Sequence, residues 1–275
     1  MAGRLTLVAG SGTLVPYVIG AAQAAGYEVQ VLAVKPREDL RDIKVKPLDL
    51  RNPLGVIATV RSFRTTHIAM AGGIVISDAV REGLQKFAGG GKGTHAAQGD
   101  AALAGLGGVL KTLTGAQLVG VHELAPDLLT PEGHLAGPAP NQDVATAARF
   151  ALDTARAIGQ LDIGQAAVVS GRRVLAVEDI GGTDALLARI GAFRTAGLAG
   201  DGRLPLVLAK AVKPQQPLFA DLPATGPATL INMASAGVQV LALDAGRTLM
   251  LERPAMLAEA ERLGITILAL PRGHG

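Results

Sequence analysis

Apolar and polar positions form alternating blocks along the first half of the chain, and these blocks predict strands and helices in turn. The apolar runs LTLVAG, EVQVLAV and HIAMAG are typical of buried strands. Helical spacing predicts a helix over 14–25 that is closed by Gly26, and another over 53–63 with Asn52 as N-cap and Pro53 at its first position. This order favours a parallel sheet with helices on both faces.

The pattern weakens in the middle of the chain and then restarts. Glycine is frequent over 72–115, where helices are expected, and AQLVGVHEL then predicts a strand. The segment LLTPEGHLAGPAPNQ is rich in proline and glycine and lacks periodicity, so a domain boundary is expected there. The predicted organisation is a Rossmann-like domain over 1–130, an ordered linker over 131–142 and a second domain over 143–275.

The second half combines helices with short strands. Strong amphipathic spacing predicts a helix over 141–160, and weaker patterns predict helices over 181–193 and 226–236. QAAVVSGRRVLAVED and VQVLALDAGRTLMLE each predict a hairpin, LPLVLA predicts a strand, and RPAMLAEAERLGITILAL predicts a helix followed by a last strand. The predicted fold class is α/β: an N-terminal Rossmann-like domain with a parallel sheet, joined by an ordered linker to a mixed α/β domain.

Residues 1–28 also have the features of a secretory leader, because Arg4 precedes an apolar stretch and AQA mimics a cleavage site. The GSG turn and Pro16 interrupt that stretch, and a second strand follows it. We therefore interpret these residues as strand, turn, helix and strand. No run of about 18 uninterrupted apolar residues occurs, so no transmembrane helix is expected and any membrane contact is expected to be peripheral.

Composition narrows the chemistry. The 275 residues are 49% hydrophobic and 18% charged, which is enough apolar material for a sizeable core. Only 3% are aromatic and the net charge is +3, so the stacking side chains and massed cations of nucleic-acid-binding proteins are missing. The chain has no cysteine, which excludes disulfides, thiolate metal sites and a cysteine nucleophile, and fits a reducing compartment such as the cytoplasm.

A glycine turn, Gly10, Ser11 and Gly12, separates the first predicted strand from the first helix. Glycines at this position let the backbone approach a phosphate at a helix N-terminus, but they also suit a plain tight turn. Binding of NAD is disfavoured, because Val15 holds the third place of the dinucleotide fingerprint and no acidic residue ends the second strand.

The five histidines show no metal-binding spacing. None forms an HxxxH or HExxH pair, which disfavours a histidine zinc site. His122 stands beside Glu123 at the end of a predicted strand. The two residues are either an ordinary strand-end pair or part of a cleft.

Acidic residues gather around a Gly-Gly turn in VEDIGGTDALL, where Glu178 and Asp179 precede the turn and Asp184 follows it. A structural explanation is a helix N-terminus that Thr183 caps and the acids favour electrostatically. The alternative is a set of carboxylates near a hard cation such as Mg²⁺.

The stretch KAVKPQQPLFADLPATGPAT follows the predicted strand LPLVLA. Its Lys210 and Lys213 are suited to neutralise phosphate oxygens, and its prolines restrict the loop. Asp221 is suited to bind Mg²⁺ or to orient a water molecule. A surface loop without chemistry is the alternative.

Two long segments, LDIGQAAVVSGRRVLAVEDIGGTDALLARI and VLAKAVKPQQPLFADLPATGPATLINMASAGVQVLALDAGRTLML, closely resemble the LpxI family, and LVAGSGTLV and VHEL fit the same family. LpxI proteins are UDP-2,3-diacylglucosamine hydrolases of lipid A biosynthesis. The resemblance implies a two-domain enzyme that holds this lipid-linked UDP-sugar between its domains and, with Mg²⁺, hydrolyses it to UMP and 2,3-diacylglucosamine 1-phosphate. It further implies a cytoplasmic protein in peripheral contact with the inner membrane, and it is compatible with a homo-oligomer.

The resemblance also assigns roles to single residues. Asp221 matches the aspartate of the DLP motif and is the expected catalytic residue, together with Lys213 and Lys210. The expected metal ligands are Asp221, Asp184 and Glu178. The expected substrate-binding residues are Gly10, Ser11, Gly12, His122, Glu123, Asp162, Gln165, Gly182, Thr183, Gln216 and Thr229.

The chain departs from the family pattern in three places. AGGIVISD stands where the family usually has an arginine-proline pair. In the first glycine loop, Pro16 lies one position later than the family's proline. Pro217, Leu218 and Phe219 stand where the family often has an acid and an arginine. Loss of an arginine near a diphosphate weakens charge neutralisation. Two alternatives therefore stay open: a diverged, non-catalytic relative that binds a lipid phosphate or a nucleotide-sugar, and a nucleotide-binding enzyme of another chemistry.

Overall fold

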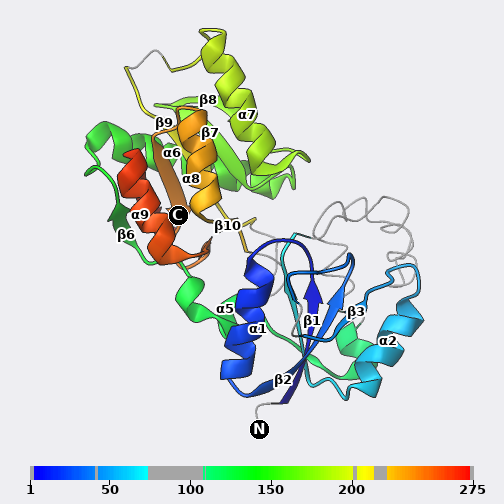
Figure 1. The fold of residues 1–275 in the computed structure, drawn as a ribbon. Coiled ribbons are helices and arrows are strands. Elements are labelled where there is room, and N and C mark those ends of the chain that lie inside the picture. The colour runs from blue at the N-terminus through cyan, green and yellow to red at the C-terminus, as the bar shows by residue number, and fades with distance from the viewer. Residues whose placement is uncertain are drawn as a thin grey trace. The chain divides into compact units, whose positions relative to one another are not determined.

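The computed structural model describes residues 3–40, 43–73, 108, 110–200, 203–213 and 222–272 (Figure 1). The chain divides into two compact units, with the division between Asp127 and Leu128. Each unit is built on its own sheet. The α/β class predicted from the sequence, with a parallel first sheet and a mixed second sheet, is confirmed.

In the described residues the first unit is built on a parallel sheet with the strand order β3-β2-β1-β4-β5. Its helices α1 and α2 lie on opposite faces of this sheet, as expected for alternating strands and helices (Figure 1). The elements are β1 (Gly3–Ala9), α1 (Leu14–Ala24), β2 (Tyr27–Ala33), β3 (Val45–Pro47), α2 (Pro53–Ser62), β4 (His67–Ala71), β5 (Gln117–Leu118) and α5 (Val121–Leu124), followed by a 3-10 turn (Pro126–Leu128).

Helix α2 begins as its sequence predicts. The Asn52 side chain accepts a hydrogen bond from the backbone N–H of Gly55 at 3.0 Å, and Pro53 occupies the first helical position, where no backbone donor is needed. The buried face of the helix packs Val56, Ile57 and Val60 against the sheet. The cap therefore fixes where the helix starts and which face it buries.

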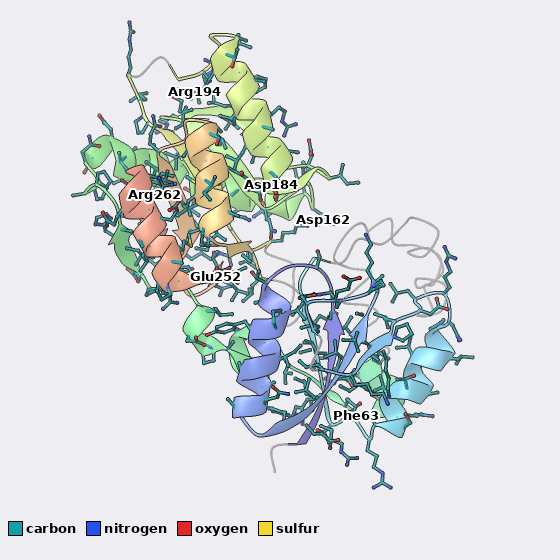
Figure 2. All side chains as sticks on the ribbon, viewed as in Figure 1. Phe63, Asp162, Asp184, Arg194, Glu252 and Arg262 are labelled. Carbon is teal, nitrogen blue, oxygen red and sulfur yellow. The ribbon has the colours of Figure 1, made fainter. Side chains whose placement is uncertain are left out.

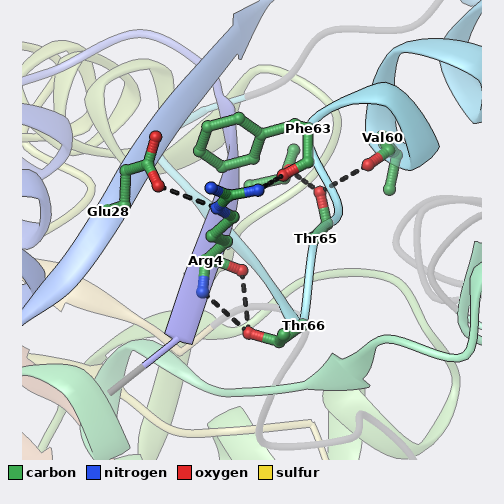
Figure 3. A network of polar contacts seen from close by, with 7 residues as sticks. Arg4, Glu28, Val60, Phe63, Thr65 and Thr66 are labelled. Carbon is green, nitrogen blue, oxygen red and sulfur yellow. Dashed lines mark hydrogen bonds and ion pairs between the residues drawn. The ribbon is translucent and has the colours of Figure 1, made fainter. Parts of the chain in front are cut away.

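A polar network ties the connection between α2 and β4 to the amino ends of β1 and β2 (Figure 3). Arg4 donates to Glu28 through Nε at 2.8 Å and to the backbone carbonyl of Phe63 through Nη1 at 3.3 Å, and its guanidinium also lies over the Phe63 ring. Its backbone N–H donates to Thr66 Oγ1 at 2.8 Å, while Thr65 Oγ1 donates to the carbonyl of Val60. This network lies at the opposite end of the strands from the glycine turn.

The second unit holds a six-stranded sheet with the order β6-β13-β11-β9-β7-β8 in the described residues. Strands β9, β11 and β13 are parallel, and β6 and β7 run antiparallel to their neighbours. The elements are β6 (Gly133–Ala136), α6 (Gln142–Gln160), β7 (Ala166–Ser170), β8 (Arg173–Val177), α7 (Gly182–Thr195), β9 (Leu206–Lys210), β10 (Ala224–Thr225), α8 (Pro227–Ser235), β11 (Val240–Asp244), β12 (Leu249–Met250), α9 (Arg253–Leu263) and β13 (Thr266–Leu270).

Side-chain alternation along these strands separates two cores. Leu208 and Leu241 point into a core that also contains residues of α7, α8 and α9. Val207 and Ala242 belong to the other core, beneath the alanine-rich face of α6. Helices therefore cover both faces of the sheet. Because successive side chains of a strand face opposite sides, nearly every residue of the central strands is buried and apolar.

Two predicted elements are wrong. AQLVGVHEL forms only a two-residue strand, because Gly120 starts the helix α5 and its backbone N–H donates to Glu123 Oε1 at 2.7 Å. VQVLALDAGRTLMLE is not a hairpin: β11 is flanked by β9 and β13, so neither of its edges is free for β12, which pairs with β10 instead. The other predicted hairpin is confirmed as the antiparallel pair of β7 and β8.

The segment 131–142, predicted as an ordered linker, contains β6, which pairs antiparallel with β13 at the edge of the second sheet. The first turn of α6 follows directly, and the Asn141 side chain accepts from the N–H of Val144 at 2.9 Å. Among the described residues, no helix is both long enough and apolar enough to cross a membrane.

Candidate active site

The glycine turn follows the carboxyl end of β1 and lies against the end of β4. The backbone N–H of Gly10 donates to the carbonyl of Ala71 at 2.8 Å, and that of Ser11 donates to the carbonyl of Gly73 at 2.9 Å. A Cβ atom at Gly10 would come within 2.5 Å of the Gly73 carbonyl oxygen, so only glycine fits this approach. Gly12 has φ +97°, which glycine adopts without strain.

The Arg37 side chain, which sequence analysis did not single out, donates hydrogen bonds to the carbonyls of the same turn. Its Nη1 donates to the carbonyl of Gly10 and its Nη2 donates to that of Gly12 at 3.1 Å. Its Nε also donates to Asp39 Oδ1 at 2.7 Å. This hydrogen bond raises the pKa of Arg37 and lowers that of Asp39. The turn carbonyls are therefore held by a guanidinium whose charge a neighbouring carboxylate balances.

We expect Gly10→Ala to destabilise the first unit by about 1–3 kcal/mol, the usual cost of forcing extra atoms into a packed site. The matched control is Gly20→Ala in α1, where a Cβ would meet no atom within 4 Å. Because alanine is a better helix former than glycine, that variant should stabilise by up to about 1 kcal/mol. Urea unfolding of both variants gives the comparison, and equal midpoints would contradict the close approach.

His122 and Glu123 lie on α5 of the first unit rather than at a strand end. Glu123 Oε1 accepts from the backbone N–H of Gly120, so one carboxylate oxygen already serves the helix start. The buried Nδ1 atom of His122 has no hydrogen-bond partner within the described part of the protein. The role of both residues in a cleft stays a prediction.

The remaining described candidates converge at one edge of the second sheet, which we call the carboxyl edge: the carboxyl ends of β8, β9 and β11, and the amino end of β7. The register pairs Lys210, the last residue of β9, with Ala166, the first residue of β7. The backbone N–H of Ala211 donates to the carbonyl of Gln165 at 2.9 Å, and that of Glu178 donates to the carbonyl of Ala166 at 2.8 Å. Ligands of open α/β sheets bind at such strand ends.

Glu178 is buried at this edge, and both of its carboxylate oxygens accept hydrogen bonds. Oε2 accepts from the backbone N–H of Gln165 and Oε1 from the hydroxyl of Thr183, at 2.8 and 2.7 Å. The predicted capping of α7 by Thr183 is therefore wrong, since the N-cap is Gly181 and Thr183 bonds Glu178 instead. This geometry supports a role for Glu178 in joining two loops; metal binding by Glu178 stays a prediction.

Asp179, next to Glu178, is exposed and has a lowered pKa. The backbone N–H of Gly181 is the larger cause, and a hydrogen bond from Arg189 is the second. Both donors favour the ionised carboxylate. The exposed Asp179 thus stabilises the loop before α7 through Gly181 and Arg189, while the buried Glu178 stabilises it through Gln165 and Thr183.

The two predicted lysines differ in burial and in partners. Lys210 is 6% exposed, and its Nζ donates to the carbonyl of Ala224 at 2.8 Å. Lys213 forms an ion pair with Asp162, with Nζ and Oδ1 2.8 Å apart. Asp162 has φ +55°, an unusual conformation for a residue other than glycine, and its carboxylate contacts the segment that follows β9. The structure therefore brings Lys210, Lys213, Asp162 and Gln165 to one edge.

Asp244 is a residue of this edge that sequence analysis missed. It ends β11 and is 1% exposed, and Arg156 of α6 donates to its Oδ1. Its Oδ2 accepts from the backbone N–H of Val212 at 3.3 Å. Asp244 thereby fixes the chain between Lys210 and Lys213. The sequence did hold one signal for Asp244, because a charged residue directly follows the apolar run VQVLAL.

Asp184 and Thr229 lie in the first turns of α7 and α8. Asp184 Oδ1 accepts from Asn232 Nδ2 at 2.9 Å, so a side-chain hydrogen bond joins the start of α7 to the second turn of α8. Gly182, with φ +74°, opens α7. Figure 2 shows Asp162 and Asp184 on the second unit.

Asp221 and Gln216 lie outside the described residues. Within the described ranges, no group of three or more histidine, aspartate and glutamate side chains is placed to hold a metal ion. Gly10, Ser11, Gly12, His122 and Glu123 belong to the first unit, and the other described candidates belong to the second. The carboxyl edge of the second sheet is thus the candidate site that the structure assembles.

Comparison with known proteins identifies relatives of both units. Residues 4–128 match the LpxI N-terminal domain, and residues 131–268 match the LpxI C-terminal domain. Over 156 residues, 57% of the chain, the sequence is 41% identical to a Caulobacter vibrioides protein named UDP-2,3-diacylglucosamine pyrophosphatase LpxI, and the match spans 56% of that protein.

Similarity to solved structures is weak. The TT0495 protein from Thermus thermophilus has a TM-score of 0.31 and 13% identity, covering 88% of this chain and 75% of that one. The Thermus thermophilus UDP-glucose 4-epimerase, solved with NAD, has a TM-score of 0.31 and 16% identity, covering 99% and 88%. Likeness at this level supports no conclusion about function.

The fold and the edge define a class: an α/β protein of two units, with polar and charged candidates at the strand ends of each. The two domain models match consecutive segments that together include most of the chain. The chain belongs to the LpxI family.

Proposed function

We propose that the protein hydrolyses the pyrophosphate bond of UDP-2,3-diacylglucosamine, giving UMP and 2,3-diacylglucosamine 1-phosphate. The observation that carries this proposal is that Lys210 ends β9 and Lys213 follows it in the segment after that strand, in a chain of the LpxI family. Two ammonium groups at one strand end suit a diphosphate. The name of the Caulobacter vibrioides relative, a UDP-2,3-diacylglucosamine pyrophosphatase, points to the same substrate.

The reaction consumes one water molecule. Its oxygen forms a bond to one phosphorus, the bridging P–O bond breaks, and the two products leave as phosphate monoesters. Lys210 and Lys213 would balance the charge that grows on the phosphoryl oxygens, which is the main task of a site for phosphoryl transfer. Asp221 is the proposed residue for orienting the water and accepting its proton.

Mg²⁺ is part of the proposal. Asp184 is exposed and has one oxygen, Oδ1, in a hydrogen bond to Asn232, so it keeps capacity for a cation, and Asp221 is proposed as the second ligand. Both oxygens of buried Glu178 serve other donors, which makes it the weakest of the three proposed ligands. A bound Mg²⁺ would supply charge neutralisation on the phosphates.

A substrate with two acyl chains is embedded in a membrane. We therefore propose peripheral contact of this protein with the inner membrane from the cytoplasmic side. Nothing in the composition suggests a nucleic-acid partner, because aromatic residues are scarce and the net charge is only +3.

UMP release from UDP-2,3-diacylglucosamine tests the proposal directly. We expect turnover with Mg²⁺, loss of turnover with EDTA, and recovery when Mg²⁺ is restored. UDP-N-acetylglucosamine, which lacks the acyl chains, serves as the comparison substrate and should react far more slowly.

A folded protein that binds the lipid substrate and releases no UMP would instead support the non-catalytic alternative. That alternative is favoured by Pro217, Leu218 and Phe219, which stand where the family usually has an acid and an arginine. If EDTA does not change the rate of UMP release, Mg²⁺ is not required and the proposed hydrolysis still holds.

A further inference from the structure

A pocket of about 360 Å³ opens between α7 and α8 in the second unit. Its volume falls within the range of about 300–1,000 Å³ that is usual for small-molecule sites. The lining comes from one face of each helix, because residues three, four and seven positions apart share a face. These residues are Asp184, Leu187, Ala188 and Gly191 of α7, Asn232 and Ser235 of α8, and Ala236, the C-cap of α8.

The polar groups of the lining bond to one another or to the helix backbone. Asn232 Nδ2 donates to Asp184 Oδ1 at 2.9 Å, and Ser235 Oγ donates to the carbonyl of Ile231 at 3.0 Å. The rest of the lining is Leu187, Ala188, Gly191 and Ala236. The pocket therefore has one polar end, at Asp184, and an apolar remainder.

Gly191 keeps the apolar end open. A Cβ atom there would touch only the Ala236 Cα, at 4.0 Å, which is ordinary contact. Gly191 also has no positive φ that would require glycine. Neither close packing nor backbone conformation therefore requires glycine at this position, and a larger side chain there would take up space in the pocket.

The polar end of the pocket lies next to the carboxyl edge along the chain. Asp184 follows Thr183, which bonds Glu178 at that edge, so the pocket starts one residue from it. Figure 2 shows Asp184 and Arg194 at opposite ends of α7. A ligand with its charged group at the carboxyl edge would therefore extend its tail along α7.

We propose that this pocket holds one acyl chain of the lipid substrate. The inference rests on the proposed function and deepens it. An aliphatic chain needs no hydrogen bonds, which matches the apolar remainder of the lining, Leu187, Ala188, Gly191 and Ala236. Each methylene buried there should lower KM about fourfold, the equivalent of about 0.8 kcal/mol, until the pocket is full.

The test measures KM for UMP release across substrates of increasing acyl length, with Gly191→Leu as the filling variant. Ala192→Leu is the matched control, since Ala192 is exposed on the same helix and is absent from the lining. A leucine side chain displaces two or three methylenes, so we expect KM for long-chain substrate to rise about 10- to 50-fold in Gly191→Leu. Short-chain substrate and the control variant should behave as in the wild type.

A second pair covers the case in which Gly191→Leu does not fold. Ser235→Leu fills the pocket from α8, and Ala234→Leu is its exposed neighbour outside the lining. Equal KM values for filled and control variants at every chain length would overturn the proposal. A rise in KM that is the same at every chain length would also overturn it. So would filled variants that keep the wild-type KM but change their oligomeric state, because the pocket would then be a contact between copies of the chain.

The failure of the proposed function has a different signature. If the wild type releases no UMP from any of the substrates, the hydrolase itself is refuted, and the acyl pocket is refuted with it. If the wild type turns over all chain lengths and only the chain-length effect is missing in the filled variants, the hydrolase stands and the pocket does not.

Discussion

Replacing Asp244 by alanine will destabilise the second unit by about 3–5 kcal/mol, because the variant takes the buried partner from the largely buried cation of Arg156. Asp244 is 1% exposed, and the Arg156 side chain that donates to it is 15% exposed. The variant also removes the acceptor of the Val212 backbone N–H. Urea unfolding followed by circular dichroism should show a lower midpoint with an unchanged slope.

The exposed pair of Glu259 and Arg262 on α9 supplies the control. These residues are an i,i+3 pair with Arg262 66% exposed, so Glu259→Ala should cost far less stability than Asp244→Ala. Replacing both Asp244 and Arg156 by apolar residues should recover much of the lost stability, because no charge is then left buried. A loss below 1 kcal/mol for Asp244→Ala would show that Asp153, the other partner of Arg156, suffices.

Lys210→Met should lower the rate of UMP release by about 10²–10³-fold, the usual effect of removing one donor from a stabilised transition state. Methionine keeps the length and the apolar stem of the lysine in a position only 6% exposed, and it removes the charge and the hydrogen bond to Ala224. The free energy of unfolding should change by no more than about 1–3 kcal/mol, the cost of an unpaired acceptor. The rate and the stability are therefore measured on the same preparations.

Lys111→Met is the matched control for the rate, since Lys111 is exposed and belongs to the first unit. Combining Lys210→Met with Asp221→Ala tests whether the two residues serve one reaction. If they do, the double variant should be little slower than the slower single variant, because residues that act together are not additive. An unchanged rate in well-folded Lys210→Met would place the chemistry elsewhere.

Hydrophobic periodicity was enough to locate the longer elements, because their burial follows the period that the sequence displays. The helix predicted over 141–160 is α6 (Gln142–Gln160), and HIAMAG contains β4. Strand β3 was not predicted and β5 was predicted too long, because three and two residues are too few to show a period. The false hairpin after β11 arose because local turn chemistry does not reveal which strand edges are already occupied.

The site was harder to predict than the fold. Lysines before a proline and acids around a Gly-Gly turn are local signals, and the structure brings Lys213 and Asp162 together although 51 residues separate them. Arg37 and Asp244 were missed because they act on backbone groups far along the chain, and nothing in their own neighbourhood indicates those partners. Glu178 carried a signal, but only its contacts distinguish the joining of two loops from metal binding.

The central place of β11 sets an order of assembly during synthesis. β11 pairs with β9 on one side and β13 on the other, so the second sheet is incomplete until residue 270 has left the ribosome. The first unit, in contrast, needs only residues up to Asp127 for its described elements. Since domains generally fold as units and the N-terminal one folds first, a growing chain would carry the described elements of the first unit for more than half of its translation. During that interval β9 and β11 lack their full set of partners, and unpaired apolar strand edges are prone to aggregation.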